Sequence, residues 1–559
     1  MKNSQNKIAI AQTNTIIGNI EYNKNKAIEN IKKAIENNMD LIVFPELYLI
    51  GNPVGNIIER YSFISNQIQE AINEIKKYSS EIEILIGYID KNNISSIAYL
   101  KNNEINKIIK KDDFSDRKIS INNTNYEILI GEELFLEKTL NSNIDAIICP
   151  SSFISRLNSE QKIHNAIISN IQKNNIDFIY VNQIGANDEL VFNGFSRIYN
   201  KNSKIIACAK NFEEDLLFID FNSTNTIDFI EELTIPIQEN FSLDYKNDLK
   251  RTYNSLVLSI KDYFSKNGFK RAVLGLSGGL DSTICAVLLA DALGSENVLG
   301  ISMPSKLTSS ESKNDAKELA QNLKINFIET PIKDMQDILC EKFNKNFKEI
   351  SNFWENESHQ SYTQDNIQAR TRATIIWGVA NEYSKALPIA TSDKSEAYMG
   401  YATINGDMSG GFAPILDVVK TKLFALANWM NENRPNKNAI PKSIILKRPG
   451  AELAINPETG KTLLAEEALM PYEFLDEVIW RIENFNQSID NMMKFEFLYE
   501  KKNILDKETK KAWLEKFFRR LNTALYKWHI VPPSPIIDSK SINSIEFKQA
   551  ITSNINYSK

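Results

Sequence analysis

The segment Gly275 to Ser282, with the sequence Gly-Leu-Ser-Gly-Gly-Leu-Asp-Ser, carries residue types that bind phosphate. Apolar runs at 272–274 and 283–289 flank it, which predicts a strand, a glycine-rich loop and a helix. Such a loop presents backbone N–H groups and the positive end of a helix dipole to an anion. Gly278 lets phosphate approach closely, and Asp281 beside a phosphate indicates a shared cation such as Mg²⁺. The segment therefore predicts a nucleotide phosphate site with a divalent cation.

This loop differs from the common P-loop, because it lacks the Gly-Lys-Ser/Thr sequence. It resembles instead the pyrophosphate loop, SGGxDS, of enzymes that split ATP into AMP and pyrophosphate. The resemblance implies ATP binding by Gly275, Leu276, Ser277, Gly278, Gly279, Leu280, Asp281 and Ser282. An ordinary Gly/Ser turn is the alternative, and the strand–loop–helix context argues against it.

The elements that must position this loop form an α/β protein with two domains. The chain of 559 residues is long enough for two or more domains, each with a full core. Residues 1–240 contain many short apolar runs and few helical stretches, which predicts an α/β sandwich. Residues 241–559 alternate strand and helix, the rhythm of a doubly wound parallel sheet with ligands at the carboxyl ends of its strands. We place the domain boundary in the polar stretch at 239–250.

Composition narrows the classes of function. A net charge of −6 favours neither nucleic acid nor an anionic membrane as a general partner. The four cysteines are widely spaced without a C-x-x-C pair, which argues against disulfides and zinc and is typical of the reducing cytoplasm. No apolar run approaches the roughly 20 residues that span a bilayer, and the N-terminus lacks a signal-peptide pattern. We expect a cytoplasmic protein without a membrane or nucleic-acid partner.

Further segments follow the loop in a fixed order. They are Asp365–Arg372, Thr391–Glu396, Gly400–Thr403, Gly406–Met408, Asp417–Thr421, Ala451–Leu453, Met470–Tyr472 and Tyr526–Lys527. Together with the loop they resemble the synthetase domain of glutamine-dependent NAD synthetase, over residues 250 to about 540. The resemblance implies a sheet of the adenine-nucleotide alpha-hydrolase type and small-molecule substrates. It also implies that AMP is transferred from ATP to the carboxylate of deamido-NAD, that ammonia then displaces AMP, and that Mg²⁺ is the cofactor.

The same resemblance implies roles for individual residues. Asp281 and Glu396 would bind Mg²⁺ or pyrophosphate, and Thr391 would contact ATP. Lys420 would meet phosphate, so that Asp281 and Lys420 are the catalytic candidates of this domain. The residues implied for deamido-NAD are Asn366, Arg370, Glu396 and Lys527.

Some positions leave alternatives open. Arg370 and Arg372 on one helix could be solvated charges, and so could Lys527, because the family's Lys-Arg-Arg-Gln run reads Lys-Trp-His-Ile here. The family's Thr-Gly-Asn-Lys-Ser-Glu pattern is changed at Ser392 and Asp393. Asp393 adds a carboxylate beside the expected Mg²⁺ site, where it would bind metal or alter how the substrate is read.

Residues 1–240 resemble the nitrilase-fold glutaminase domain of the same family, an αββα sandwich. The matching segments are Ala11–Gln12, Gly18, Phe44–Leu47, Tyr180–Gln183 and Val191–Ser196. That fold uses a Glu base, a Lys that stabilises the oxyanion and a Cys nucleophile. Glu46 occupies the base position, and Lys111, with Lys110 close behind, is the best match for the lysine.

The nucleophile itself is missing from its expected place. The apolar run at 128–130 predicts a strand. Glycine, Gly131, follows this run, where the family has Cys. Cys149 ends a later strand and is better explained as a small buried hydrophobe than as a substitute. The segment at 113–117 and Leu157 also depart from the family's glutamine pocket. Glu46 and Lys111 are then vestigial, and we expect ammonia to be used directly, with the domain kept as a scaffold for a homo-oligomer.

The sequence is compatible to different degrees with four other functions. The chain could hydrolyse glutamine after all, or it could be an amide ligase for nicotinate mononucleotide. A tRNA-thiolating enzyme with a pyrophosphate loop would need paired catalytic cysteines and a basic face, neither of which the sequence shows. Against an inactive structural protein stand the residues retained in the synthetase segments, Ser277, Asp281, Asn366, Thr391 and Glu396.

Overall fold

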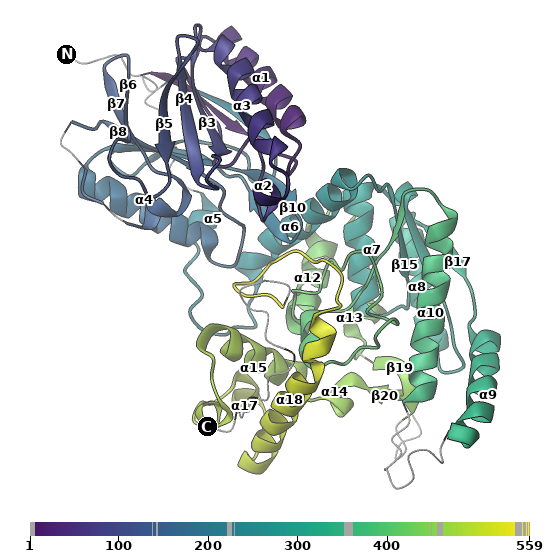
Figure 1. Cartoon of the computed structure of the whole chain (residues 1–559). Helices are drawn as coiled ribbons and strands as arrows, with labels where there is room; N and C mark the ends of the chain where they lie inside the picture. Colours follow the sequence, from purple (N-terminus) through teal and green to yellow (C-terminus); the bar gives the residue numbers. More distant parts are fainter. Residues whose placement is uncertain are drawn as a thin grey trace. The chain divides into compact units, whose positions relative to one another are not determined.

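The computed structural model shows two compact units, Met1–Gln238 and Glu239–Lys559 (Figure 1). The structure describes residues 6–136, 138–140, 143–220, 226–227, 230–350, 362–448, 450–455 and 462–542, and residues 551, 555 and 557. Within these residues, no helix combines the length and the apolar character needed to cross a bilayer.

The N-terminal unit is built on two six-stranded sheets. The first contains, in spatial order, β14 (Asp215–Asp220), β1 (Lys7–Gln12), β2 (Leu41–Val43), β3 (Glu83–Ile89), β4 (Ser95–Lys101) and β5 (Glu104–Lys110). The second contains β13 (Ile205–Cys208), β12 (Arg197–Tyr199), β9 (Asp177–Asn182), β8 (Ala146–Ser151), β7 (Thr124–Ile128) and β6 (Lys118–Ile121). A separate hairpin joins β10 (Ile184–Asn187) to β11 (Leu190–Asn193).

Alternating side chains make these sheets the middle layers of a sandwich. Ile10 and Val43 of the first sheet pack in one buried cluster with Ile148 and Val181 of the second. Neighbouring residues point the other way, where they pack against the helices, because successive side chains of a strand face opposite sides. The outer helices are α1 (Ile20–Glu36), α2 (Ile57–Arg60) and α3 (Phe63–Ile75) on the first sheet, and α4 (Ser159–Asn174) and α5 (Glu231–Thr234) on the second. The expected αββα sandwich is confirmed.

One strand boundary differs from the prediction. The apolar run at 128–130 was expected to be a strand, but β7 begins at Thr124 and ends at Ile128. Leu129 and Ile130 are buried beyond its end, and a 3-10 helix, Gly131–Leu136, begins directly afterwards. Gly131 therefore occupies a sharp turn at the end of a strand.

The C-terminal unit contains a parallel sheet with the order β17 (Asn326–Glu329), β16 (Val298–Ser302), β15 (Arg271–Gly275) and β18 (Ala386–Pro388). One face packs on α6 (Lys246–Lys266), α7 (Leu280–Leu293), α8 (Ser310–Leu323) and α12 (Lys420–Asn433) through a large apolar cluster. The other face packs on α10 (Thr363–Glu382). Helices on both faces confirm the doubly wound sheet.

A second core holds the last part of this unit together. Tyr398, Leu475 and Leu521 pack there and come from α11 (Lys394–Tyr398), α15 (Tyr472–Phe485) and α18 (Lys507–Trp528). The remaining elements are α9 (Lys333–Ile350), α13 (Lys442–Leu446), β19 (Gly450–Ile455), β20 (Thr462–Leu464), α14 (Ala465–Ala468), α16 (Ile489–Met492) and α17 (Leu498–Lys502). The short helix α11 is held in place because Ala397 and Tyr398 pack into this core.

Candidate functional site

A cavity of about 270 Å³ lies at the carboxyl ends of the central strands of the C-terminal unit. The glycine loop after β15, Ser302 and Met303 at the end of β16, and Thr391 beyond β18 line it. In the sheet β15 lies between β16 and β18, so the strand order reverses here. Open α/β sheets bind ligands at such a switch point, because the connections on its two sides leave in opposite directions.

The glycine loop packs closely against the backbone of α8. Gly278 has a φ of +77°, and a Cβ on it would lie 2.1 Å from the Ser312 carbonyl oxygen, so only glycine fits. The hydroxyl oxygens of Ser277 and Ser282 lie 3.0 Å apart, and the Gly279 N–H donates to Ser277 Oγ over 3.1 Å. Helix α7 begins at the next residue, so its first N–H groups and its dipole face the loop. The predicted phosphate loop therefore has the geometry of an anion site.

Three carboxylates meet beside this loop around one buried ammonium group. One oxygen from each lies within 4.8 Å of the others, and we call Asp281, Asp393 and Glu396 the carboxylate cluster. Lys420 Nζ lies 2.8 Å from both carboxylate oxygens of Asp281. It also lies 2.6 Å from Asp393 Oδ2 and 3.1 Å from Glu396 Oε1. Asp281 and Glu396 line the cavity, whereas Asp393 and Lys420 are fully buried.

Burial dominates the electrostatics of the cluster. It raises the pKa of Asp393 and raises that of Glu396 well above its usual range, while the charge of Lys420 opposes both shifts. Burial alone would lower the pKa of Lys420, but the three carboxylates hold it well above its ordinary value. One ammonium group cannot balance three ionised carboxylates, so a further cation would stabilise the ionised forms that burial disfavours. Oxygen donors of this kind fit a hard divalent ion such as Mg²⁺.

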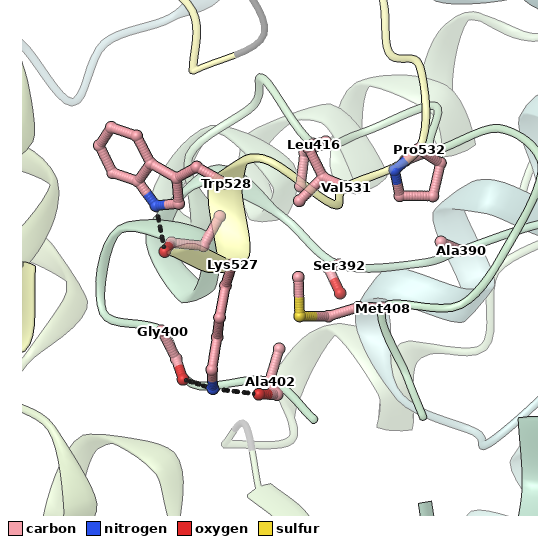
Figure 2. A pocket seen from close by; sticks show the side chains of 12 residues that line it. Ala390, Ser392, Gly400, Ala402, Met408, Leu416, Lys527, Trp528, Val531 and Pro532 are labelled. Carbon is pink, nitrogen blue, oxygen red and sulfur yellow. Dashed lines mark hydrogen bonds between the residues drawn. The ribbon is translucent and has the colours of Figure 1, made fainter. Parts of the chain in front are cut away.

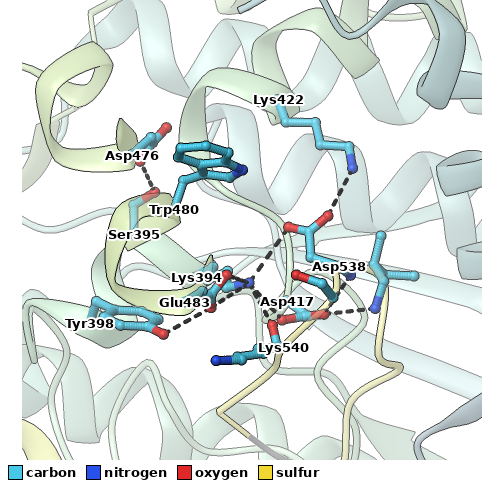
Figure 3. Close-up of polar contacts among 12 residues, drawn as sticks. Lys394, Ser395, Tyr398, Asp417, Lys422, Asp476, Trp480, Glu483, Asp538 and Lys540 are labelled. Atoms are coloured by element: carbon cyan, nitrogen blue, oxygen red, sulfur yellow. Dashed lines mark hydrogen bonds and ion pairs between the residues drawn. The ribbon is translucent and has the colours of Figure 1, made fainter. Parts of the chain in front are cut away.

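A buried carboxylate from α15, Asp476, connects α11, which carries Glu396, to the start of α12, which carries Lys420; Figure 3 shows its contact with Ser395. Asp476 Oδ1 accepts a hydrogen bond from Ser395 Oγ over 2.6 Å. Asp476 Oδ2 accepts from the N–H and the hydroxyl of Thr421, over 2.9 and 2.7 Å. Because Ser395 precedes Glu396 and Thr421 follows Lys420, Asp476 positions the acid and the ammonium relative to each other.

A second buried ion network anchors the start of α11 (Figure 3). Lys394 is fully buried, and its Nζ lies 2.8 Å from Glu483 Oε1 and 3.2 Å from Asp417 Oδ1. The same ammonium donates to the Lys540 carbonyl over 2.9 Å. A buried cation is tolerated only when it is paired in this way. The network therefore fixes the backbone next to the carboxylate cluster.

The residues predicted for deamido-NAD are more dispersed than the phosphate residues. Asn366 Oδ1 accepts from the Thr403 hydroxyl over 2.8 Å, and Arg370 is exposed with its Nε donating to the Ile404 carbonyl over 3.2 Å. Neither is among the described residues that line the cavity.

Lys527 likewise contacts backbone rather than the large cavity. Its Nζ donates to the carbonyls of Gly400 and Ala402 over 2.7 and 2.5 Å, at the edge of a second, smaller cavity (Figure 2). Ser392 lines both cavities, so the two adjoin.

The structure adds cationic residues that sequence reasoning missed or left open. Arg372 lines the cavity and donates to the Met303 carbonyl over 3.1 Å. Its spacing from Ala369 and Ile376, at three and four positions, puts it on the lining face of α10, a signal that could have separated it from Arg370. Lys447, which donates to Ser312 Oγ, also lines the cavity, but its loop has no pattern that predicts this.

The N-terminal unit brings its own predicted residues together. Glu46 lies buried after β2, where its carboxylate accepts from the hydroxyls of Ser95 and Ser152 over 2.9 and 3.1 Å. Lys111 Nζ lies 3.4 Å from the same carboxylate, while Lys110 pairs with Asp90 instead. Burial raises the pKa of Glu46, and the Lys111 charge opposes the shift.

Gly131 lies directly against Glu46. It has a φ of +53°, and a Cβ on it would come 2.4 Å from Glu46 Oε2. Hydrolases often present a nucleophile on such a strained turn after a strand. Cys149 Sγ is buried 3.8 Å from the Gly131 carbonyl oxygen, and burial raises the pKa of its thiol to about 12. A thiol with this pKa stays protonated at neutral pH and is a poor nucleophile.

Known proteins resemble this chain over both of its units. The NAD synthase family model matches residues 252–515. The glutamine-dependent NAD(+) synthetase of Aquifex aeolicus is 31% identical over 535 residues, which cover 87% of this chain and 91% of the relative. A solved glutamine-dependent NAD+ synthetase from Acinetobacter baumannii, in complex with adenosine diphosphate, is 25% identical with a TM-score of 0.70, over 98% of both chains. A glutamine-dependent NAD(+) synthetase from Cytophaga hutchinsonii shares the fold over 98% of both chains, with a TM-score of 0.79 at 19% identity.

Proposed function

The chain belongs to the family of glutamine-dependent NAD(+) synthetases, and from this premise we propose that it amidates deamido-NAD to NAD in an ATP-dependent reaction. The nicotinate carboxylate cannot react with ammonia directly, because its oxygen is a very poor leaving group. Attack of that oxygen on the α-phosphorus of ATP breaks the bond to pyrophosphate and forms an acyl adenylate. Ammonia then attacks the acyl carbon, AMP leaves, and the amide nitrogen loses a proton to solvent.

The observation that supports this chemistry is the glycine loop next to the carboxylate cluster. The loop would hold the pyrophosphate half of ATP at the start of α7, with hydroxyl donors from Ser277 and Ser282. Asp281 and Glu396, with Asp393 behind them, would hold Mg²⁺. When bound, Mg²⁺ would neutralise charge on the phosphates as pyrophosphate leaves. The residues of the site mainly bind and orient the reactants, and such positioning supplies a large part of the rate advantage of a multi-substrate ligase.

We further propose that this chain uses free ammonia. The supporting observation is Gly131, which adjoins the Glu46 carboxylate without offering a thiol. Covalent hydrolysis of glutamine starts with attack by a thiolate, and neither Glu46 nor Lys111 can replace it. The buried Cys149 thiol is protonated at neutral pH and does not offer an alternative. The N-terminal unit would then serve as an assembly scaffold, and sedimentation of the full chain tests the expected homo-oligomer.

The deciding experiment supplies the full-length protein with deamido-NAD, ATP and Mg²⁺, and with either ammonium chloride or glutamine. NAD, AMP, pyrophosphate and glutamate are measured together. We expect NAD formation with ammonium and none above background with glutamine. Glutamine-driven NAD synthesis with stoichiometric glutamate release would show that the N-terminal unit is an active glutaminase.

The substrate is tested in the same assay. Nicotinate mononucleotide replaces deamido-NAD in a parallel reaction, because Ser392 lines the cavity and Asp393 lies behind it. We expect a strong preference for deamido-NAD. Equal or better turnover of the mononucleotide would identify the chain as a ligase for that smaller substrate.

A further inference from the structure

We propose that the Lys420 ammonium is a built-in counter-cation, which occupies the cation position of the carboxylate cluster until a divalent ion arrives with the nucleotide phosphates. The proposal rests on the proposed function, in that it takes the magnesium complex of ATP as the substrate. It assigns Lys420 a first task before any contact with phosphate, which is to keep the cluster together in the nucleotide-free protein.

The contacts of Lys420 support this assignment. The ammonium lies within 3.1 Å of all three carboxylates, and its side chain is only 1% exposed. An ion bound by the same oxygens would lie in immediate contact with the ammonium, since these oxygens are within 4.8 Å of one another. Two cations that close repel each other strongly in a buried site. Lys420 and a divalent ion therefore exclude each other from the cluster.

The ammonium also satisfies the cluster incompletely. Asp393 Oδ2 is buried and lies 2.6 Å from Lys420 Nζ, yet it accepts no well-oriented hydrogen bond from the described residues. When all three carboxylates are ionised, one ammonium leaves negative charge unbalanced. A divalent ion with several oxygen ligands would balance that charge better, so the exchange is favourable once the ammonium has another partner.

The phosphate loop provides that partner. Asp281 belongs to the loop and contacts Lys420 directly, so phosphate oxygens bound at the loop would lie beside the cluster. The lysine ammonium sits on a flexible four-carbon stem, so it can turn from carboxylate to phosphate without moving α12. The divalent ion and the nucleotide then assist each other's binding, and such coupling is reciprocal.

The test measures binding of Mn²⁺, a substitute for Mg²⁺, to the nucleotide-free full-length protein by electron paramagnetic resonance. The variants are Lys420→Met and Lys420→Gln, and the matched control is Lys447→Met, which removes a lysine of the same cavity that contacts Ser312 rather than the cluster. We expect both Lys420 variants to bind Mn²⁺ more tightly than the wild type by about tenfold or more. The Lys447 variant should bind as the wild type does.

Unchanged Mn²⁺ affinity in the Lys420 variants overturns the proposal, and so does equal tightening in the Lys447 variant. If the Lys420 variants are unstable alone, thermal unfolding with and without Mn²⁺ decides the question. Mn²⁺ should then raise their Tm by more than it raises that of the wild type, and no such rescue would refute the exchange. Because no turnover is needed, these results stand apart from the NAD synthesis assay, whose failure would count against the proposed function alone.

Discussion

Replacing Gly131 by alanine should destabilise the protein far more than the same replacement at Gly55. The two glycines have nearly the same backbone conformation, with φ of +53° and +54°. Around Gly55, a Cβ would meet nothing within 4 Å, whereas at Gly131 it would come 2.4 Å from Glu46 Oε2. The pair therefore separates the cost of the left-handed backbone from the cost of displacing the buried carboxylate.

The expected magnitudes follow from these contacts. An alanine in the left-handed region costs about 1–2 kcal/mol at either position. At Gly131 the Glu46 carboxylate must also turn away, which breaks its hydrogen bond from Ser152 and costs about 1.5–3 kcal/mol more. We expect the free energy of unfolding to fall by about 2.5–5 kcal/mol for Gly131→Ala and by about 1–2 kcal/mol for Gly55→Ala.

Urea-induced unfolding of the full chain, followed by far-ultraviolet circular dichroism, gives the two differences. Hydrogen exchange of the amides in β7 and β8 shows whether the loss is local to the contact with Glu46. Equal destabilisation by the two substitutions would refute the reasoning. It would mean that the side chain at 131 does not face Glu46, and the argument that a nucleophile belongs at this position would lose its geometric support.

Three further predictions concern single residues. Arg372→Ala should raise the KM for ATP by about tenfold or more, whereas the exposed Arg370→Ala should change it little, as steady-state kinetics with ammonium would show. Cys149→Ser should leave NAD formation unchanged, and iodoacetamide should not label Cys149 in the folded protein, because burial raises the pKa of its thiol to about 12. For Asp476, burial raises the pKa to about 7 in the folded protein from an ordinary value of 3.8, so ionisation makes wild-type stability fall as pH rises through this interval. The unfolding free energy of Asp476→Asn relative to the wild type should therefore rise by about 2–3 kcal/mol between pH 5 and pH 8. The same difference between variant and wild type at both pH values would contradict this.

Local signals in the sequence were sufficient for the fold and the phosphate loop. The apolar runs around Gly275–Ser282 predicted a strand and a helix, and the structure has β15 and α7 there. Alternation of strand and helix predicted the doubly wound sheet, since parallel strands need helical connections. A glycine that must accept a φ of +77° also leaves a mark in the sequence, because no other residue type fits against the Ser312 carbonyl.

The partners of the site residues were decided by tertiary structure alone. Nothing near Lys420 in the sequence indicates that its ammonium lies between three carboxylates, because these belong to segments that are distant along the chain. The same holds for Asp476, whose role depends on α15 packing against the starts of α11 and α12. How close Lys111 and Gly131 come to Glu46 also depends on long-range packing. The sequence by itself determined the residue types and the local backbone that each position requires, whereas distances and charge pairing between remote segments exist only once the cores have packed.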